Sequence, residues 1–214
     1  MGHILCFNGG YVNELIVENK NLFFAMVNSM TMQSEGCQGD WMVSVSDKPV
    51  EFSKYTDLSV QFAPFQVNRK NLLNKLYAVF EHKALLAENY IKTGELLGEL
   101  ERYLFELAEE LPFDVRFQKL AIGPIIRALA PVIDEDEKSS LERIFSYMEL
   151  IRELDRERVF IMINMRSYFS NEDMDTFIES VCLHDFKLLL LESSAQPQLK
   201  NSKRYIIDVD LCEL

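Results

Sequence analysis

Apolar residues form two continuous runs in the last third of the chain, at Val159–Asn164 and Phe186–Glu192. Each run ends abruptly in a polar residue, as expected of a strand buried on both faces. Between them, Asn171–Val181 has the spacing of an amphipathic helix, so the three segments predict a β-α-β unit. A further strand is predicted at Arg204–Asp210, after a polar loop. These patterns predict an α/β fold with a mostly parallel sheet covered by helices.

The first third of the chain shows shorter patterns. Strands are expected at His3–Phe7 and Asn13–Val17, and a helix with one apolar face is expected at Asn21–Met32. Two further strand-like segments follow, Trp41–Val45 and Ser59–Phe65, separated by turn residues. We expect these two segments to form a small antiparallel piece ahead of the helices.

The middle of the chain, from Val67 to Asp155, is almost wholly helical by its period. Apolar residues recur at spacings of three and four from Leu73 to Ile91 and again from Leu96 to Leu111, with Gly94 as the expected break. A last helix follows at Leu141–Leu154. Since strand patterns lie on both sides of this stretch, it is predicted to be an insertion into one α/β domain.

The predicted organisation is therefore a discontinuous α/β domain and an inserted helical domain. The α/β domain comprises 1–68 and 158–214, and the helical domain comprises 69–157. With 214 residues, 48% of them hydrophobic, the chain can bury a sizeable core.

Charge is unevenly distributed along the chain. Lys and Arg total 22 against 34 Asp and Glu, a formal net charge of -12, which taken as a whole disfavours nucleic acid as a partner. Seven acidic residues between Glu95 and Asp114 accompany only Arg102, whereas the flanking stretches are basic. The basic residues that are candidates for DNA contact are Lys70, Lys75, Lys83, Lys92, Arg116, Lys119 and Arg127. The alternative is that solvated helix faces differ in sign by chance.

Motifs for nucleotide chemistry are missing from the sequence. No Gly-x-x-x-x-Gly-Lys-Ser/Thr occurs, so the cradle for nucleotide phosphates is absent. Asn164 stands at a strand end where a nucleotidase would carry an acidic residue, and an amide cannot replace a carboxylate in holding magnesium. Glu192, Asp208 and Asp210 are expected to be solvated strand ends. No catalytic residue is predicted, and we expect a protein that is not an enzyme.

The sequence also indicates a compartment. Its four cysteines are scattered, without a Cys-x-x-Cys pair, and its three histidines are isolated. No apolar run approaches the length that crosses a bilayer, and the N-terminus does not have the pattern of a signal peptide. We therefore expect a cytoplasmic protein with no membrane partner.

The order of the elements carries a family resemblance. The segments that match, in sequence order, are Leu15–Asn19, Trp41–Phe65, Asn71–Tyr77, Leu111–Val115, Leu129–Ile133, Val159–Asn164, Phe186–Glu192 and Arg204–Asp210. In this order and spacing they resemble the Csn-two family, the spacer-acquisition proteins of type II-A CRISPR systems. The resemblance spans nearly the whole chain, and each segment alone is mainly hydrophobic pattern.

The resemblance implies a head with a degenerate P-loop-nucleotidase-like α/β core, and a helical leg. It implies a ring-shaped homotetramer whose basic hole threads the ends of linear double-stranded DNA, acting without catalysis and without a required cofactor. The CRISPR adaptation integrase and the effector nuclease are the implied protein partners. Calcium stabilises the ring in some members through acidic residues of the leg. The candidates for that role here are Glu106, Glu109, Glu110 and Asp114.

Two other functions are compatible with the sequence. One is a nucleotide-dependent kinase or hydrolase on the same core, which a phosphate-binding loop would support. The other is a protein-interaction scaffold that does not bind DNA, in which the basic residues are incidental. Salt-sensitive DNA binding distinguishes the scaffold from a DNA-binding ring.

Overall fold

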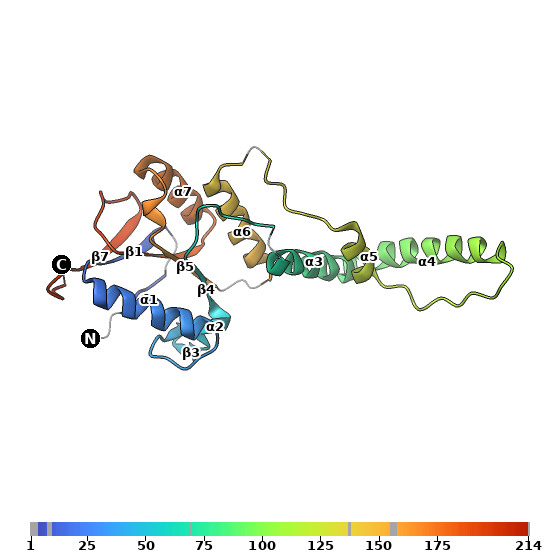
Figure 1. The fold of residues 1–214 in the computed structure, drawn as a ribbon, viewed down its shortest axis with the longest axis horizontal. Helices are drawn as coiled ribbons and strands as arrows, with labels where there is room; N and C mark the ends of the chain where they lie inside the picture. The colour runs from blue at the N-terminus through green and yellow to red at the C-terminus, as the bar shows by residue number, and fades with distance from the viewer. Residues whose placement is uncertain (1–3, 8–9, 69, 137, 155–157, 214) are drawn as a thin grey trace. The chain divides into compact units, whose positions relative to one another are not determined.

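A computed structural model describes residues 4–7, 10–68, 70–136, 138–154 and 158–213. The chain divides into two compact units, each described separately below (Figure 1). The sheet unit comprises 1–66 and 137–214, and the helical unit comprises 67–136. In the part of the chain that is described, no helix is both long enough and apolar enough to span a membrane.

The sheet unit is built on a five-stranded parallel sheet with the strand order β4-β5-β6-β1-β7. Its strands are β1 (Val12–Val17), β4 (Thr56–Ser59), β5 (Val159–Ile163), β6 (Lys187–Glu192) and β7 (Ser202–Ile207). This arrangement confirms the predicted α/β class. The three central strands β5, β6 and β1 are almost entirely buried, which explains their continuous apolar runs.

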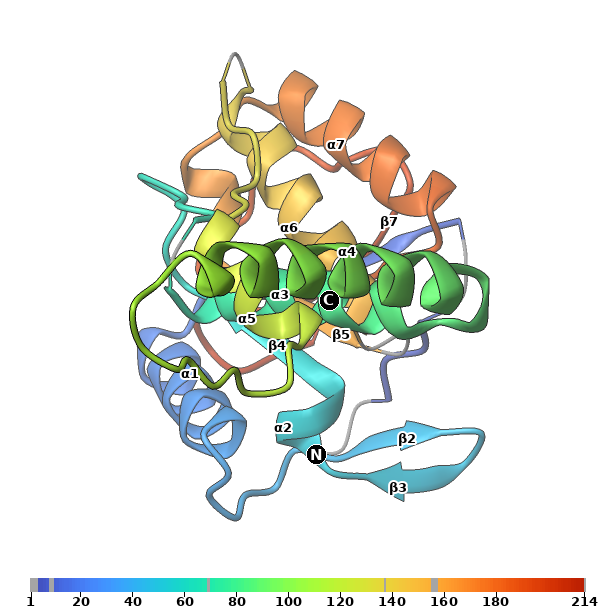
Figure 2. The same cartoon turned by 90° about the vertical axis from the view of Figure 1, so that its right-hand side faces the viewer.

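Helices cover both faces of the sheet. On one face α1 (Lys20–Ser34) contributes Met30 to a core cluster with alternate residues of the central strands, among them Leu15, Ile161 and Leu189. On the other side lie α6 (Ser140–Leu154) and α7 (Asn171–Leu183), which bury one apolar face each (Figure 2). The strand period of two therefore divides the core into two layers, one on each face of the sheet.

Side chains satisfy the free amides at the starts of two of these helices. Asn19 accepts a hydrogen bond from the Leu22 amide at 3.1 Å and caps α1. Ser170 accepts from the Asp173 amide at 3.1 Å and donates to the Asp173 carboxylate at 2.6 Å, which caps α7. These caps fix where the chain leaves the sheet after β1 and after β5.

The predicted strand at Ser59–Phe65 is wrong. β4 ends at Ser59, and the chain then forms a loop that contains Pro64, which has no amide to donate to a strand partner. Phe62 and Phe65 are buried by ring packing, with their centroids 6.4 Å apart. The burial of these two aromatic side chains therefore reflects ring contacts with the core rather than a strand.

The other early strand predictions fare differently. Trp41–Val45 shortens to β2 (Val43–Val45), which pairs antiparallel with β3 (Lys48–Val50). Of His3–Phe7, His3 lies outside the described residues. Residues 4–7 do not form a strand, although Leu5 and Phe7 pack against the core cluster.

The helical unit contains α3 (Lys70–Leu85), α4 (Ala87–Glu109) and α5 (Ile122–Leu129). The break between the two long helices falls at Leu86, not at the predicted Gly94, which lies inside α4. Thr93 donates to the Ala84 carbonyl at 2.8 Å, so the start of α4 is held against the end of α3. No atom of the described residues would contact a methyl group added at Gly94, so close packing among those residues does not require this glycine.

A small polar network ties together the two ends of the helical unit. Glu135 accepts hydrogen bonds from the Val67 and Asn68 amides at 3.0 and 3.2 Å. The Asn68 side chain donates to the Ile133 carbonyl at 2.8 Å and accepts from the Ile133 amide at 2.9 Å. The insertion thus spans 67–136, whereas the sequence suggested 69–157, because α6 packs in the sheet unit.

Candidate functional site

Ligands of parallel α/β folds usually bind at the carboxyl ends of the strands, where a phosphate-binding loop would join β1 to α1. Here only Glu18 and Asn19 connect them. The Glu18 amide donates to the Ile207 carbonyl and the Asn19 side chain donates to the Val209 carbonyl, both at 2.9 Å. The C-terminal segment therefore packs against the position where nucleotide phosphates would be held.

Two polar side chains end the neighbouring strands. Asn164 has a left-handed backbone, with φ of 53°, and accepts a hydrogen bond from the Ser193 amide at 2.8 Å. Glu192 is only 2% exposed, so the expectation of a solvated strand end is wrong for this residue. It accepts from the Arg166 amide at 3.2 Å, and burial raises the pKa of its carboxyl to about 7.

The remaining predicted strand ends are partly solvated. Asp208 is half-buried and uses one carboxylate oxygen to accept from the Asp210 and Cys212 amides at 2.9 and 2.7 Å. Asp210 is exposed. Both residues therefore end or follow β7 as elements of a turn.

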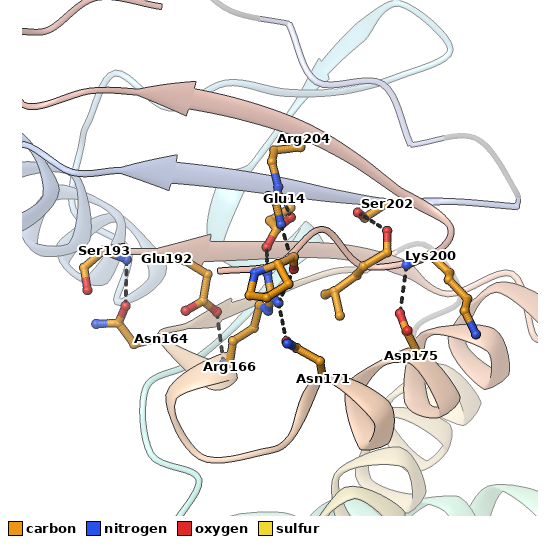
Figure 3. Close-up of polar contacts among 12 residues, drawn as sticks. Glu14, Asn164, Arg166, Asn171, Asp175, Glu192, Ser193, Lys200, Ser202 and Arg204 are labelled. Carbon is orange, nitrogen blue, oxygen red and sulfur yellow. Dashed lines mark hydrogen bonds and ion pairs between the residues drawn. The ribbon is translucent and has the colours of Figure 1, made fainter. Parts of the chain in front are cut away.

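A cluster of buried charges lies beside Glu192 (Figure 3). Glu14, in the middle of β1, forms an ion pair with Arg166, and neither side chain is exposed. The second oxygen of Glu14 accepts from Arg204 of β7 at 2.7 Å. Both guanidinium groups also donate to the Pro197 carbonyl, from Arg166 at 2.7 Å and from Arg204 at 3.1 Å.

This cluster fixes the return of the chain from β6 to β7. A buried charge is strongly destabilising without a partner, so each member requires the others. Because Arg166 and Glu14 are sealed from solvent, they offer no surface to a substrate. Sequence analysis missed both residues. The sequence signals were a carboxylate, Glu14, inside one apolar strand and an arginine, Arg166, soon after a second apolar strand. Their separation of 152 residues gave no hint that they meet.

All the basic residues predicted to contact DNA fall in the helical unit. Lys70, Lys75 and Lys83 lie on α3, Lys92 on α4, Arg116 and Lys119 on the loop after α4, and Arg127 on α5. Lys75 is half-buried and the others are exposed.

The positions of these residues indicate which of them share a surface. Lys75 and Lys83 are eight residues apart, about 80° around the helix axis, so they project from one side of α3. Lys70 projects from a different side. The loop bearing Arg116 and Lys119 is held to α4 by the Leu120 amide, which donates to Glu101 at 3.2 Å. Contact of these residues with DNA stays a prediction.

The predicted calcium residues lie at the end of α4 and in the following loop, and all four are exposed. Carboxylates are suitable calcium ligands. Among the described residues of this single chain, however, no three acidic, histidine or cysteine side chains come together as a metal site. Calcium binding by Glu106, Glu109, Glu110 and Asp114 therefore stays a prediction.

The molecule is a parallel α/β protein with an inserted helical unit. Its C-terminal segment packs against the β1–α1 connection, where related folds bind nucleotide phosphates. A family model described as CRISPR-associated protein (Cas_Csn2) matches residues 33–211. The chain thus belongs to the Csn2 family of CRISPR-associated proteins, the family that the sequence resembles. It is 23% identical over 164 residues to CRISPR-associated protein Csn2 of Enterococcus faecalis, covering 75% of this chain and 71% of that protein.

Proposed function

We propose that this protein binds the ends of linear double-stranded DNA during CRISPR spacer acquisition, as a ring-shaped homotetramer and without catalysis. Membership of the Csn2 family, over residues 33–211, is the observation that carries the proposal. It acts in the cytoplasm, and its protein partners are the CRISPR adaptation integrase and the effector nuclease.

The charge distribution supports DNA binding by the helical unit. Six of the seven candidate basic residues are exposed there, while the chain as a whole carries a net charge of -12. Exposed Lys and Arg bind phosphates without reading sequence. Binding is therefore sequence-independent.

Exposed apolar residues on both units support self-association. Phe24 of α1 is 71% exposed, and Leu129 of α5 is 77% exposed. Contiguous exposed apolar surface is typical of interfaces, and the assembly proposed here would cover these side chains. Light scattering should return about four times the 24.9 kDa chain mass. Calcium, if it stabilises the ring, will raise this mass relative to a sample in chelator. A monodisperse monomer at micromolar concentration in both buffers excludes the tetramer.

The closed connection between β1 and α1 supports the absence of nucleotide hydrolysis. Phosphoryl transfer needs groups that stabilise the developing charge, and the two-residue connection leaves no loop to cradle phosphates. Purified protein should release no phosphate from ATP above a control without enzyme, with or without DNA. Release above that control would favour the kinase or hydrolase alternative.

DNA topology provides the test of the ring. Linear blunt duplex and a covalently closed circle of the same sequence are compared in a binding titration at low salt. A ring that is threaded by a DNA end binds the linear form and leaves the circle unbound, whereas a groove binder accepts both. Equal affinity for the two forms contradicts threading. No binding of either form favours the interaction scaffold.

A further inference from the structure

A groove runs between α6 and α7, which lie on the same side of the sheet in the sheet unit (Figure 2). Its volume is about 510 Å³, within the range that is typical of ligand-binding pockets. The apolar part of its lining consists of Leu141 and Phe145 of α6, which are half-buried, and Phe177 of α7, which is buried. We name this feature the α6–α7 groove.

Aromatic contacts hold the lining of the α6–α7 groove in place. Phe145 packs edge-on against Phe186, with ring centroids 5.5 Å apart, and against His184, with centroids 5.0 Å apart. Arg152 donates to the His184 carbonyl at 2.9 Å and stacks over the Phe186 ring. The groove is therefore formed before a ligand binds, which lowers the ordering cost of docking.

Exposed acidic residues border this apolar surface. Glu142 and Asp173 line the groove from its two helices. Glu149 lies seven residues after Glu142, about two helical turns, so it extends the same side of α6. The Ser139 amide, which donates to the Glu142 carboxylate at 2.7 Å, holds the pKa of Glu142 below its usual range. The border of the groove is therefore negatively charged at neutral pH.

The charge and shape of the groove indicate its occupant. Among the described residues that line it, Lys138 is the one base, and it donates to the Ser146 hydroxyl at 3.2 Å. The acidic border disfavours DNA, whose phosphates bind cations. An extended peptide would leave backbone amides without partners, because α6 and α7 use their own backbone groups within each helix. A helix satisfies its own backbone and fits between the side-chain ridges of two neighbouring helices.

We propose that the α6–α7 groove docks an amphipathic helix of a partner protein, with Lys or Arg on the flanks of its apolar side. Apolar side chains of that helix, spaced by three and four residues, contact Leu141, Phe145 and Phe177. The three carboxylates on the border favour a basic helix over an acidic one. The groove belongs to the sheet unit, whereas the residues proposed for DNA lie in the helical unit, so docking is a second function of the chain.

The test uses three labelled peptides of about three heptads. The first has Leu along one side of the helix and Lys on both flanks, and the second has Glu in place of Lys. The third is a scrambled form of the first, which keeps its charge and loses the apolar side, because a protein with a net charge of -12 attracts any cation. In fluorescence anisotropy with the full-length protein, the first peptide should bind at least about tenfold more tightly than either of the others.

The double variant Glu142→Gln, Glu149→Gln tests selection by charge. Gln at position 142 keeps an oxygen for the Ser139 amide, which donates to Glu142. Affinity for the first peptide should fall about three- to thirtyfold, as expected for the loss of two exposed ion pairs. The control, Glu35→Gln with Asp47→Asn, makes the same charge change at exposed positions after α1 and in the β2–β3 turn. It should leave the affinity unchanged.

A bulky side chain tests the groove itself. Thr176 lines the groove and is exposed, so Thr176→Trp places a large ring in the groove without replacing a buried residue. Affinity for the first peptide should fall at least about tenfold. Asn28→Trp, at an exposed position of α1 on the other face of the sheet, is the control and should bind like the wild-type protein. Circular dichroism checks that both variants stay folded.

Four outcomes would overturn the proposal. Equal binding of the first and scrambled peptides, or unchanged affinity in folded Thr176→Trp, excludes docking of a helix in the groove. Equal binding of the basic and acidic amphipathic peptides excludes selection by charge. A changed mass of the Thr176→Trp protein in light scattering, with peptide binding intact, would assign the groove to contact between copies. Failure to prefer linear DNA over closed circles counts only against the proposed function, so the two proposals fail independently.

Discussion

Glu192 should make the sheet unit less stable as pH rises through neutrality. Glu192 is 2% exposed, and burial raises the pKa of its carboxyl from 4.5 to about 7. The folded state therefore favours the protonated form, and this contribution to stability is fully present below 4.5 and lost as pH rises through about 7. The difference between the unfolded and folded pKa values corresponds to about 3 kcal/mol of free energy of unfolding, since each pKa unit is worth about 1.4 kcal/mol.

The substitution Glu192→Gln removes the titration and keeps an oxygen to accept from the Arg166 amide, which donates to Glu192 at 3.2 Å. The variant should gain up to about 3 kcal/mol over the wild-type protein at pH 8.5 and little at pH 4.5. Trp41 is the only tryptophan and packs against the core cluster of the sheet unit, so its fluorescence follows urea unfolding of that unit. Glu179→Gln, on the exposed side of α7, is the matched control.

Other groups also titrate between these pH values, so the difference between variant and wild type is the quantity to compare. The difference must grow with pH for Glu192→Gln and stay flat for Glu179→Gln. A Glu192→Gln difference that is constant between pH 4.5 and 8.5, or that shrinks as pH rises, would refute the reasoning from burial.

Three other sets of substitutions test separate features. Arg166→Met leaves Glu14 with less charge compensation and should destabilise the sheet unit by about 3–5 kcal/mol in urea titrations. Glu14→Gln should cost less stability when it is added to Arg166→Met than when it is made in the wild-type protein. Equal costs would mean that the pair is not coupled. The double variant Lys75→Gln, Lys119→Gln should reduce the steepness of log affinity for DNA against log salt by about 0.9 for each lysine that contacts a phosphate. An unchanged slope in a variant that is still a tetramer excludes phosphate contact by both lysines. Asn19→Ala should cost about 1 kcal/mol through the lost cap of α1, and a neutral result would contradict that role.

The helices and strands that could be predicted are those whose own hydrophobic spacing identifies their secondary structure. β5 and β6 were predicted within a residue of their observed bounds, because a strand buried on both faces must be apolar throughout. α7 was equally clear, since its buried side repeats at helical spacing. Distant contacts are different. Phe62 and Phe65 lie in an apolar segment that resembles a strand, but both are buried by ring packing in a loop.

The buried charges could not be predicted for the same reason. Glu14 and Arg166 each look unfavourable in their own segment, and only the sheet order β6-β1-β7 makes them partners. The helix break at Leu86 is also set by contacts, since one glycine such as Gly94 costs only about 1 kcal/mol and did not end α4. The candidate basic residues could be found from sequence, but the surface that they share depends on how the helices pack.

The network that joins Asn68 and Glu135 has a consequence for how this protein can vary. Because the amides of Val67 and Asn68 and both backbone groups of Ile133 are held together, the chain leaves and returns at one place. Closing a longer loop between fixed ends costs little extra entropy, about 0.6 kcal/mol for each doubling of length. Insertions and deletions between these anchors can therefore change the span of the helical unit while the sheet keeps its register. Exchanging the helical unit between relatives at positions 67 and 136 should therefore preserve a folded sheet.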